Sequence, residues 1–477
     1  MLWLIIPAVI LVFLTFTLIR AAGFRPPAGQ EFPACEAIVD SGKVIGHLAE
    51  MIRCKTVSYY REELIDYAEF RKFRELLERF YPLTHRSCNP EYIGKTGILF
   101  KFAGESSDCP SVLMAHYDVV PAEERAWEKP PFEGVIEGGF LWGRGTLDTK
   151  STLCGVMEST EALLAQGFKP KNDIYLAFSG NEELFGESAE AIVSELEKRG
   201  VRPVMVVDEG GAVVQNIFPG VKERCALIGI GEKGMLDVEF VLAGKGGHSS
   251  APPPHTPVGI LSKAVAVVED NPFKCQLTKP AREMFDTLGR YSTFPYRYIF
   301  ANLWCFLPVL DLLCKKNGGE MNALMRTTCA FTVMEGSKAA NVIPPVAKIG
   351  ANIRPMGSDT VAGSIDYIKK LIKNEDISVN IIDGKDASNV SETQGVGWER
   401  LKMAIRQTWP DALISPYLMI AGSDSRYYDR ISSHVYRFSA MELSGEERGL
   451  IHGNNERIAI DKAAMIVQFY MRLMWNC

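Results

Sequence analysis

This chain of 477 residues lacks an excess of basic residues and a paired cysteine pattern, and it has few histidines. It has no excess of basic residues: 52 Lys and Arg stand against 58 Asp and Glu, giving a formal net charge of -6. This balance argues against nucleic acid as a partner. The 11 cysteines form an odd number without a CxxC pair, which argues against a disulfide scaffold and favours reduced, buried thiols. Histidine is scarce as well, with seven residues, so each one merits inspection.

The composition describes a globular protein with ample apolar residues for its core. Hydrophobic residues make up 47% of the chain and charged residues 23%. The chain is too long for one ordinary hydrophobic core, so we expect two domains and additional segments.

One long apolar run stands at the N-terminus. The stretch from Leu2 to Ile19 is uncharged and is followed by Arg20, Arg25 and two prolines. Its length matches a single bilayer span, and no basic region precedes it. We predict a membrane anchor over residues 1–25, with a cleaved signal peptide as the alternative. The flanking arginines favour a cytoplasmic catalytic part and leave the side of the membrane open.

The first domain is predicted to be a mostly parallel, doubly wound α/β sheet. Residues 97–102, 111–115, 173–179 and 204–208 have the pattern of strands, and helix-length segments separate the last three. In such sheets the chemistry lies at the carboxyl ends of the strands. We assign residues 34–228 and 385–477 to this catalytic domain.

A second domain is predicted between the two parts of the first. The order of elements over residues 229–384 is βαββαβ, the ferredoxin-like arrangement of an inserted lid or dimerisation domain. Residues 271–322 form an excursion within it. This excursion contains ANLWCFLPVLDLL, which Pro308 and Asp311 interrupt too often for a membrane span. A lid-packing surface, a membrane-apposed surface and plain core all remain open for this run.

Acidic and imidazole side chains follow the predicted strands. His116 and Asp118 come directly after the buried run Val112–Ala115, and Asp148 closes a glycine-rich turn ahead of a helical pattern. Such residues on loops held by a sheet are typical metal ligands. The alternative is that they are ordinary polar residues at strand ends.

Two pairs of adjacent carboxylates follow further strands. Glu182 and Glu183 come after DIYLAFS, and Asp208 and Glu209 end VMVVD. Neighbouring carboxylates repel each other when both are ionised, which indicates a nearby cation. A solvated loop at a helix N-terminus is the alternative for the glutamate pair. Both Asp208 and Glu209 are within reach of a metal, and we choose Asp208 because it completes the strand.

A site with two metal ions needs one histidine for each ion, a bridging carboxylate and a terminal carboxylate for each ion. His452, on a loop before the last helix, is the remaining candidate for the second imidazole. Glu182 is then left over as a general base. The ligand set predicted in this way is His116, Asp148, Glu183, Asp208 and His452.

Seven motifs together resemble a known family. They occur in the family's order between residue 34 and the C-terminus: MAHYDVVP, WGRGTLDTK, SGNEE, VVDEGG, GKGGHSS, NVIPP and LIHGNNE. The chain thereby resembles the zinc-dependent aminoacylases and carboxypeptidases, closest to the carboxypeptidase S and N-acyl-amino-acid hydrolase branch. One departure is the Asn in SGNEE, where relatives more often carry Asp or His.

The resemblance implies two Zn²⁺ per chain, with Co²⁺ or Mn²⁺ as substitutes, and Asp148 as the ligand that bridges them. It implies that Asp118 orients His116 and that Glu182 is the general base. It also implies that His248 stabilises the oxyanion, commonly across a homodimer formed through the lid. The substrate-binding candidates are Asn341, Arg354 and Gly422, the last in the Gly/Ser turn of LMIAGSDSRYY.

The function predicted from these features is hydrolysis of an amide bond in a small molecule. Peptides with a free C-terminal carboxylate and N-acyl amino acids both fit a guanidinium at Arg354. The apolar surface of the lid, beside a membrane anchor, favours fatty N-acyl amino acids. The alternative is a catalytically inactive, membrane-anchored binding or scaffold protein of the same fold, but the complete set of ligands and base argues for an enzyme.

Overall fold

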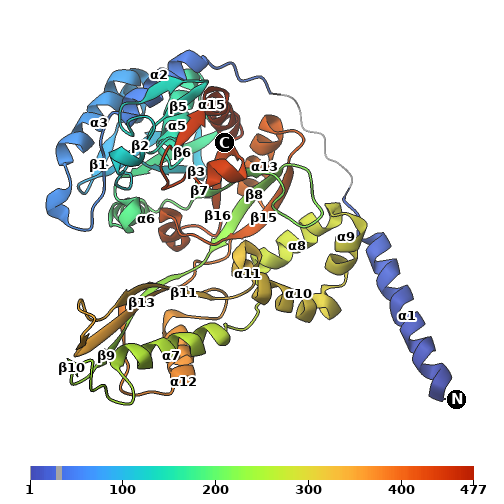
Figure 1. Cartoon of the computed structure of the whole chain (residues 1–477). Helices are drawn as coiled ribbons and strands as arrows, with labels where there is room; N and C mark the ends of the chain where they lie inside the picture. The colour runs from blue at the N-terminus through green and yellow to red at the C-terminus, as the bar shows by residue number, and fades with distance from the viewer. Residues whose placement is uncertain (1, 28–34) are drawn as a thin grey trace.

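The computed structural model describes residues 2–27 and 35–477, with side chains from residue 5 onward. Met1 of the predicted anchor and residue 34, the predicted start of the catalytic domain, lie outside the described residues. Figure 1 shows a large α/β unit built from both ends of the chain, a smaller unit below it, and a long helix, α1 (Leu2–Gly23), that points away from the body. Residues Ile5–Gly23 form the one helix, among those described, that is long and apolar enough by itself to cross a membrane.

The larger unit is built on an eight-stranded sheet with the order β1-β2-β6-β3-β7-β16-β8-β15. The four central strands β6, β3, β7 and β16 are parallel, while β2 and β8 pair antiparallel with the flanks of this group. The predicted mostly parallel sheet is therefore confirmed. Its strands are β1 (Glu91–Ile93), β2 (Gly97–Phe102), β3 (Ser106–His116), β6 (Asn172–Ser179), β7 (Met205–Val214), β8 (Cys225–Glu232), β15 (Leu413–Met419) and β16 (Val435–Leu443).

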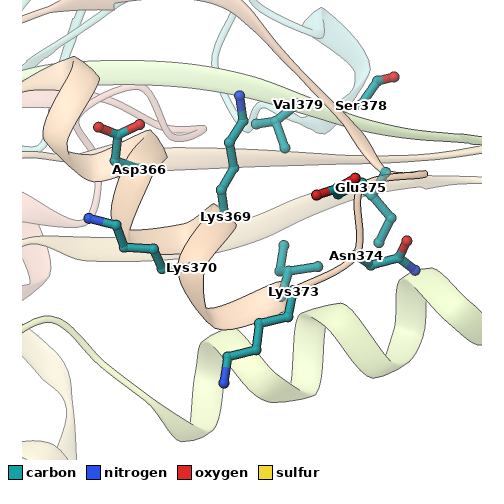
Figure 2. Close-up of a pocket in the computed structure, with 10 residues that line it drawn as sticks. Asp366, Lys369, Lys370, Lys373, Asn374, Glu375, Ser378 and Val379 are labelled. Atoms are coloured by element: carbon teal, nitrogen blue, oxygen red, sulfur yellow. The ribbon is translucent and has the colours of Figure 1, made fainter.

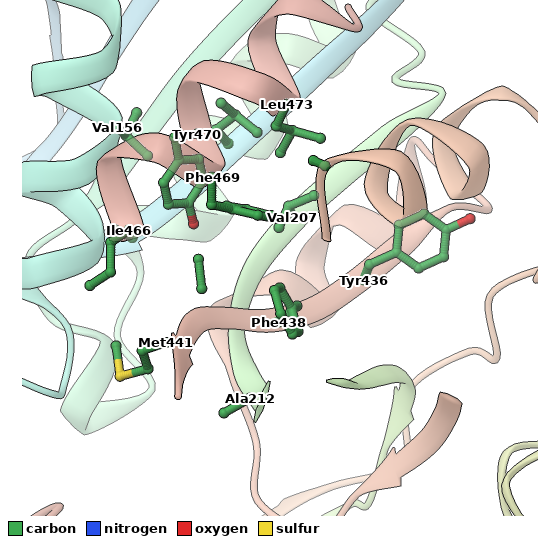
Figure 3. Packing of buried hydrophobic residues seen from close by; sticks show 14 of the residues in the cluster. Val156, Val207, Ala212, Tyr436, Phe438, Met441, Ile466, Phe469, Tyr470 and Leu473 are labelled. Carbon is green, nitrogen blue, oxygen red and sulfur yellow. The ribbon is translucent and has the colours of Figure 1, made fainter. Parts of the chain in front are cut away.

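Helices cover both faces of this sheet. In Figure 3, Phe469 and Tyr470 of the last helix pack over Phe438 of β16 and Val207 of β7. Val206 points to the opposite face of β7 and belongs to a separate hydrophobic cluster. The face of the sheet that includes Val207 is covered by α2 (Ser41–Ile52), α3 (Tyr67–Phe80), α4 (Pro82–Cys88), α5 (Lys150–Ala165), α13 (Val396–Thr408) and α15 (Ile460–Trp475). The opposite face is covered by α6 (Ser188–Lys198) and η4 (Asp424–Arg430).

The smaller unit is an antiparallel sheet with two helices and its own hydrophobic core. The strands have the order β11-β13-β9-β14, and the elements follow one another as βαββαβ. A short pair, β10 and β12, extends from its outer end. The elements are β9 (Met235–Ala243), β10 (Gly247–His248), α7 (Pro257–Asp270), β11 (Thr328–Glu335), β12 (Val342–Ile343), β13 (Val346–Arg354), α12 (Val361–Ile372) and β14 (Ser378–Lys385).

Four helices inside the range predicted for the lid contribute side chains to the core of the catalytic unit. Met284, Phe285 and Leu288 of the first of these helices belong to the core of the large sheet, and that helix contacts β15. The chain order therefore does not separate the two units at one boundary. We call this segment the insertion; it comprises α8 (Lys279–Tyr291), α9 (Phe294–Ala301), α10 (Leu303–Asn317) and α11 (Gly319–Met325).

A three-stranded sheet ties together two loops near the carboxyl edge of the large sheet. β17 pairs with β5, and β5 pairs with β4. The loop after β5 leads to α5, and the loop before β17 follows α14. The elements concerned are β4 (Val135–Glu137), β5 (Phe140–Trp142), α14 (Gly445–Arg448) and β17 (Arg457–Ala459); three short turns of 3-10 helix are η1 (Glu62–Leu64), η2 (Glu124–Ala126) and η3 (Glu182–Leu184).

Candidate metal centre

The parallel strands bring several candidate residues to one edge of the sheet. His116 is the last residue of β3, and η3, with Glu182 and Glu183, follows β6. Since β6, β3 and β7 are parallel neighbours, their carboxyl ends meet at this edge. Asp148 and His452 arrive on the two loops that the β17–β5 pairing ties together.

Asp148 lies between the two imidazoles. Its Oδ1 is 2.8 Å from His116 Nε2, and its Oδ2 is 3.0 Å from His452 Nε2. A second carboxylate approaches the same Nε2 atom of each imidazole: Glu183 Oε2 is 3.0 Å from His452 Nε2, and Glu209 Oε1 is 3.4 Å from His116 Nε2. The arrangement is two His–carboxylate groups that share Asp148, with one aspartate oxygen for each.

Asp118 holds both the imidazole and the acidic loop. Its carbonyl oxygen is 3.0 Å from His116 Nδ1, so an N–H at that position leaves Nε2 free to bind a metal. Its carboxylate accepts the backbone N–H groups of Glu182 at 3.1 Å and of Glu183 at 3.2 Å, and the hydroxyl of Ser58 at 2.7 Å. The fully buried Asp118 therefore fixes the backbone of η3 against the end of β3.

The structure brings Glu209, and not the predicted Asp208, to His116. Successive side chains of a strand point to opposite faces. Asp208 points to the same face as Val206, where its Oδ2 accepts the backbone N–H of Ser425 in η4 at 3.0 Å. Glu209 points to the face on which α5 begins, next to Asp148. The geometry therefore favours Glu209 over Asp208 as the ligand, because completing a strand does not determine which face a side chain occupies.

Burial and mutual repulsion raise the pKa of most carboxyls at this edge. Burial and the charge of Glu209 hold the pKa of Glu182 well above its usual range. Burial and Asp148 do the same to the pKa of Glu209, and burial raises the pKa of Glu183 against the hydrogen bond from His452. Burial raises the pKa of Asp148 too, but its bonds to the two imidazoles outweigh this and lower it. So many buried acids favour a bound cation, which would relieve their repulsion.

The donor set fits metal ions. Within the described residues, two groups have ligand atoms that all lie within 4.8 Å of one another: His116, Asp148 and Glu183, and His116, Glu182 and Glu209. Glu183 Oε1 is buried without a hydrogen-bond partner, as a ligand oxygen would be before an ion binds. Ligand atoms of a tetrahedral zinc at about 2.0–2.1 Å stand about 3.3 Å apart. The His–carboxylate separations of 2.8–3.4 Å are close to this value.

Two predicted residues lie at the outer end of the lid. His248 ends β10 with an exposed side chain, and Ser250 donates its backbone N–H to His248 Nδ1 at 3.1 Å. Asn341 is next to it, since its carbonyl accepts the N–H of Ser249 at 3.0 Å. The nine residues of β9, about 30 Å of extended chain, separate this end from the junction with the catalytic domain. The fold therefore does not bring His248 together with the metal ligands of its own chain (Figure 1).

Arg354 and Gly422 lie at the junction of the two units. Arg354 ends β13 and donates from Nε to Asn352 Oδ1 at 2.9 Å; burial lowers the pKa of its guanidinium, and Asp237 opposes this. A Cβ on Gly422 would lie 3.2 Å from the ring of Phe185, directly after η3. Arg354 belongs to the lid side of this junction and Gly422 to the catalytic side, and both are nearer to the metal centre than His248 is.

Sequence reasoning did not single out Glu456 and Asp424. Glu456 is fully buried and accepts backbone N–H groups of the loop that carries Asp148. Asp424, the first residue of η4, lies beside the end of β6, where Ser179 donates its hydroxyl to Asp424 Oδ2 at 2.5 Å. Glu456 is part of the quoted motif LIHGNNE and Asp424 of LMIAGSDSRYY, so an acidic residue inside each motif was the available signal.

An apolar cavity of about 190 Å³ adjoins the metal centre. Its lining includes Gly210 and Ile451, the sequence neighbours of Glu209 and His452, and Met321 and Leu324 of α11, but none of the candidate ligands themselves. A larger hollow of about 790 Å³ lies on the lid over α12. Figure 2 shows that lysines and other polar residues of α12, of the turn after it and of β14 surround it, and its lining includes none of the candidate site residues.

Comparison with known proteins identifies the family. Residues 112–476 match the profile of Peptidase family M20/M25/M40. The chain belongs to this family. The resemblance inferred from the motifs is thereby confirmed, and with it the prediction of a metal-dependent hydrolase.

The M20 relatives cover nearly the whole chain. It is 34% identical over 440 residues to an N-fatty-acyl-amino acid synthase/hydrolase, PM20D1, of Xenopus tropicalis, covering 91% of this chain and 86% of that protein. It is 33% identical over 437 residues to a probable carboxypeptidase S-like protein of Dictyostelium discoideum, covering 90% and 84%.

Solved structures of M20 proteins share the fold. A metallo-carboxypeptidase of Sulfolobus solfataricus superposes with a TM-score of 0.67 at 18% identity, covering 91% of this chain and 98% of that one. A Bacillus subtilis peptidase of the M20 family, described as binding a dinuclear metal, gives a TM-score of 0.56 at 11% identity, covering 91% and 97%.

Proposed function

We propose that this protein hydrolyses the amide bond of N-acyl amino acids, with a fatty acyl chain in the apolar cavity beside the metal centre. Peptides with a free C-terminal carboxylate are the second substrate class. The observation that carries the proposal is the position of the cavity, whose lining includes the immediate neighbours of Glu209 and His452. The Xenopus relative supports the acyl class by its name, and the Dictyostelium relative supports the peptide class.

The proposed cofactors are two Zn²⁺ per chain. His116, Asp148 and Glu209 would hold one ion, and Asp148, Glu183 and His452 the other. Two imidazoles with carboxylates suit zinc, and Co²⁺ or Mn²⁺ would substitute. When bound, the ions would polarise the amide carbonyl and lower the pKa of a water molecule toward neutrality.

Glu182 is the proposed general base. Its carboxylate would accept the proton of the attacking water and then deliver it to the leaving nitrogen. Burial and the charge of Glu209 raise the pKa of Glu182, the direction that favours a carboxyl that must also hold a proton. The hydrogen bond from the backbone N–H of Glu182 to Asp118 supports this role, because it fixes the residue that carries the base.

The cavity matches a hydrocarbon chain in chemistry and size. The side chains in its lining are mainly aliphatic, with Glu320 and Arg448 as the charged exceptions. An apolar cavity of about 150 Å³ is enough to hold benzene without water. A cavity of about 190 Å³ therefore suits the first segment of an acyl chain.

The amino acid part of the substrate would face the junction with the lid. Arg354 would pair with its carboxylate as a planar fork, and the absence of a side chain at Gly422 would leave room beside Phe185. Asn341 and His248 would contact substrate only from the lid of a second copy, where His248 would donate a hydrogen bond to the oxyanion. The exposure of both residues supports a homodimer formed through the lid.

The helix α1 is the proposed membrane anchor. It has the length and apolar character of a span, and the side of the membrane on which the catalytic domain lies stays open. If the mature protein in the native host begins after Gly23, α1 is a cleaved signal peptide and not a membrane anchor.

The test is a substrate panel. Purified full-length protein in detergent with zinc is assayed with acyl derivatives of one amino acid, from acetyl to oleoyl, and with dipeptides. Each methylene buried in the cavity contributes about 0.8 kcal/mol, so kcat/KM should increase about fourfold per methylene until the cavity is full. Met321→Trp should shorten the preferred chain and leave the acetyl substrate unaffected, with Met321→Leu as the control.

The other outcomes distinguish the alternatives. Turnover of dipeptides without acyl substrates would make the protein a carboxypeptidase. Zinc-loaded protein that turns over no member of the panel would favour the inactive scaffold.

A further inference from the structure

The helix α10 exposes its apolar side. Trp304, Val309, Leu312 and Leu313 of this helix are 59%, 54%, 67% and 50% exposed. The charged residue in the middle of the helix, Asp311, instead faces the protein and forms ion pairs with Arg326 and Lys315. A helix on the surface of a water-soluble protein normally has the opposite arrangement.

The preceding helix continues this surface around a corner. The chain bends by 112° between α9 and α10; the two together are long and apolar enough for a span, but the bend prevents a straight crossing. Phe294 and Tyr296 of α9 are also exposed, at 48% and 44%. We define the corner surface as Phe294, Tyr296, Trp304, Val309, Leu312 and Leu313.

The last turns of α1 pack against this corner. Thr17 Oγ1 is 2.7 Å from the hydroxyl of Tyr298, and the guanidinium of Arg20 donates to the carbonyl of Ala301 at 3.1 Å. The rings of Phe13 and Phe16 lie 6.0 and 6.2 Å from the ring of Trp304. α1 and the corner are therefore one packed unit.

The length of α1 sets the depth of that unit. Its 22 residues extend about 33 Å at 1.5 Å per residue, while the hydrocarbon core of a bilayer is about 30 Å thick. If α1 crosses a bilayer, almost none of it is left outside. Phe16 is seven residues before the end of the helix at Gly23, which is about 10 Å along its axis. Trp304, which contacts Phe16, must then lie at a similar depth.

We propose that the α9–α10 corner lies within the leaflet that borders the catalytic domain, at the boundary between headgroups and acyl chains. Its chemistry fits this position: tryptophan and tyrosine concentrate at membrane interfaces, and an apolar helix face lies about 5–10 Å deep there. Lys315 and Lys316 lie in the last turn of α10, Arg20 lies in the last turn of α1 and Arg25 follows it, so the rim is positive and suits anionic lipid headgroups.

The embedding has a consequence for the cavity beside the metal centre. α8 and α11, which contribute Met284, Met321 and Leu324 to its wall, directly flank the corner in the chain. The corner would hold this wall beside the bilayer, so an amphiphile in the leaflet has a short path to the cavity. The inference rests on the proposed anchor, and it does not depend on the substrate.

The test uses the full chain in vesicles of phosphatidylcholine and phosphatidylserine whose acyl chains are brominated close to the headgroup. Bromine quenches tryptophan fluorescence at short range. The difference in emission between wild type and Trp304→Phe isolates Trp304. We expect that difference emission to be blue-shifted and quenched by the brominated lipid, and to be protected from iodide in the water.

A matched control puts the reporter elsewhere. In the Trp304→Phe background, Val333→Trp puts an exposed tryptophan on β11 of the lid, where the native valine is 53% exposed. This reporter should be quenched by iodide and not by the lipid. Leu312→Asp with Leu313→Asp should reduce the lipid quenching of Trp304, whereas Val333→Asp with Met334→Asp should not. These four residues are all exposed, so the substitutions should leave the melting temperature unchanged.

Three outcomes would overturn the inference. Trp304 of membrane-bound protein that is quenched by iodide and not by lipid would put the corner in water. Protection from both quenchers, together with crosslinking of two chains, would make the corner a contact between copies. Protein that does not co-float with vesicles at all would remove the anchor itself, and the inference with it.

Discussion

Glu456 Oε1 accepts the backbone N–H of Leu147 at 2.7 Å, one residue before the aspartate that bridges the two imidazoles. The same carboxylate accepts the N–H of Gly145 at 3.1 Å and pairs with Arg144 at 2.8 Å. This buried group therefore joins the loop of Asp148 to the loop of His452, and it acts on the metal centre through the position of both ligands.

Glu456→Gln should weaken metal binding without removing a ligand. Partners that orient ligands typically contribute about 10- to 100-fold in metal affinity. We expect a loss of that size in a titration with competing chelator, and recovery of activity at excess zinc. Glu446→Gln, an exposed neighbour that pairs with Arg457, is the control. Unchanged affinity in Glu456→Gln would show that the β17–β5 pairing alone holds the two loops.

Glu209→Gln and Asp208→Asn should have different effects on metal content. Glu209 lies 3.4 Å from His116, whereas the carboxylate of Asp208 accepts a backbone N–H of η4. Metal analysis after gel filtration should give about one zinc per chain for Glu209→Gln, because one ion loses its terminal carboxylate. Asp208→Asn should keep two zincs. The reverse result would restore Asp208 as the ligand.

Glu182→Gln should separate chemistry from metal binding. A general base contributes typically 10²- to 10⁴-fold, so kcat should fall by at least about 100-fold. Metal content should stay at two zincs per chain, since the proposed ligands are other residues. Loss of metal together with activity would mean that Glu182 is a ligand, a possibility that its position in a group with His116 and Glu209 makes worth measuring.

Asp424→Asn should change how the stability of the metal-free protein depends on pH. Burial raises the pKa of Asp424 from 3.8 to about 7, against a hydrogen bond from Ser179. Between these values the folded protein holds a proton that the unfolded chain has lost, so the free energy of unfolding falls as pH rises.

The variant has no such proton. In urea titrations with EDTA it should become more stable relative to wild type from about pH 4 to about pH 7, and the difference should be constant above this range. Two parallel stability curves over that range would show that Asp424 is ionised in the folded protein at all these pH values.

Arg354→Lys should affect substrates that carry a carboxylate. A lysine supplies a point charge in place of a planar fork, so KM should rise for acyl amino acids and stay close to wild type for the matching amides. His248→Ala should instead lower kcat for both kinds of substrate, by about 100- to 1,000-fold if it binds the oxyanion. Equal losses on acids and amides in Arg354→Lys would remove this residue from the substrate site.

The sequence was sufficient for features that depend on strand ends. His116 and the Glu182–Glu183 pair follow strands of a parallel sheet, so their convergence with Asp148 follows from the topology. The βαββαβ order of the lid was likewise readable from the alternation of elements.

Other features depend on packing that the sequence does not contain. Whether Asp208 or Glu209 faces the site depends on which face of β7 packs against α15 and which against η4. The role of Glu456 depends on the pairing of β17 with β5, two strands of three residues each with no pattern of their own. The place of α8 on the large sheet was also missed, because its apolar side gives no indication of which core it joins.

The lid and the catalytic unit have separate hydrophobic cores, while α8–α11 belong to the core of the large sheet although the chain encodes them inside the lid. Melting of this protein is therefore not expected to be a single two-state transition. The lid can lose its structure as one cooperative unit while the insertion, with its side chains in the other core, stays folded until the large sheet melts. A calorimetric trace should contain two transitions, of which only the one from the catalytic unit moves when zinc is removed.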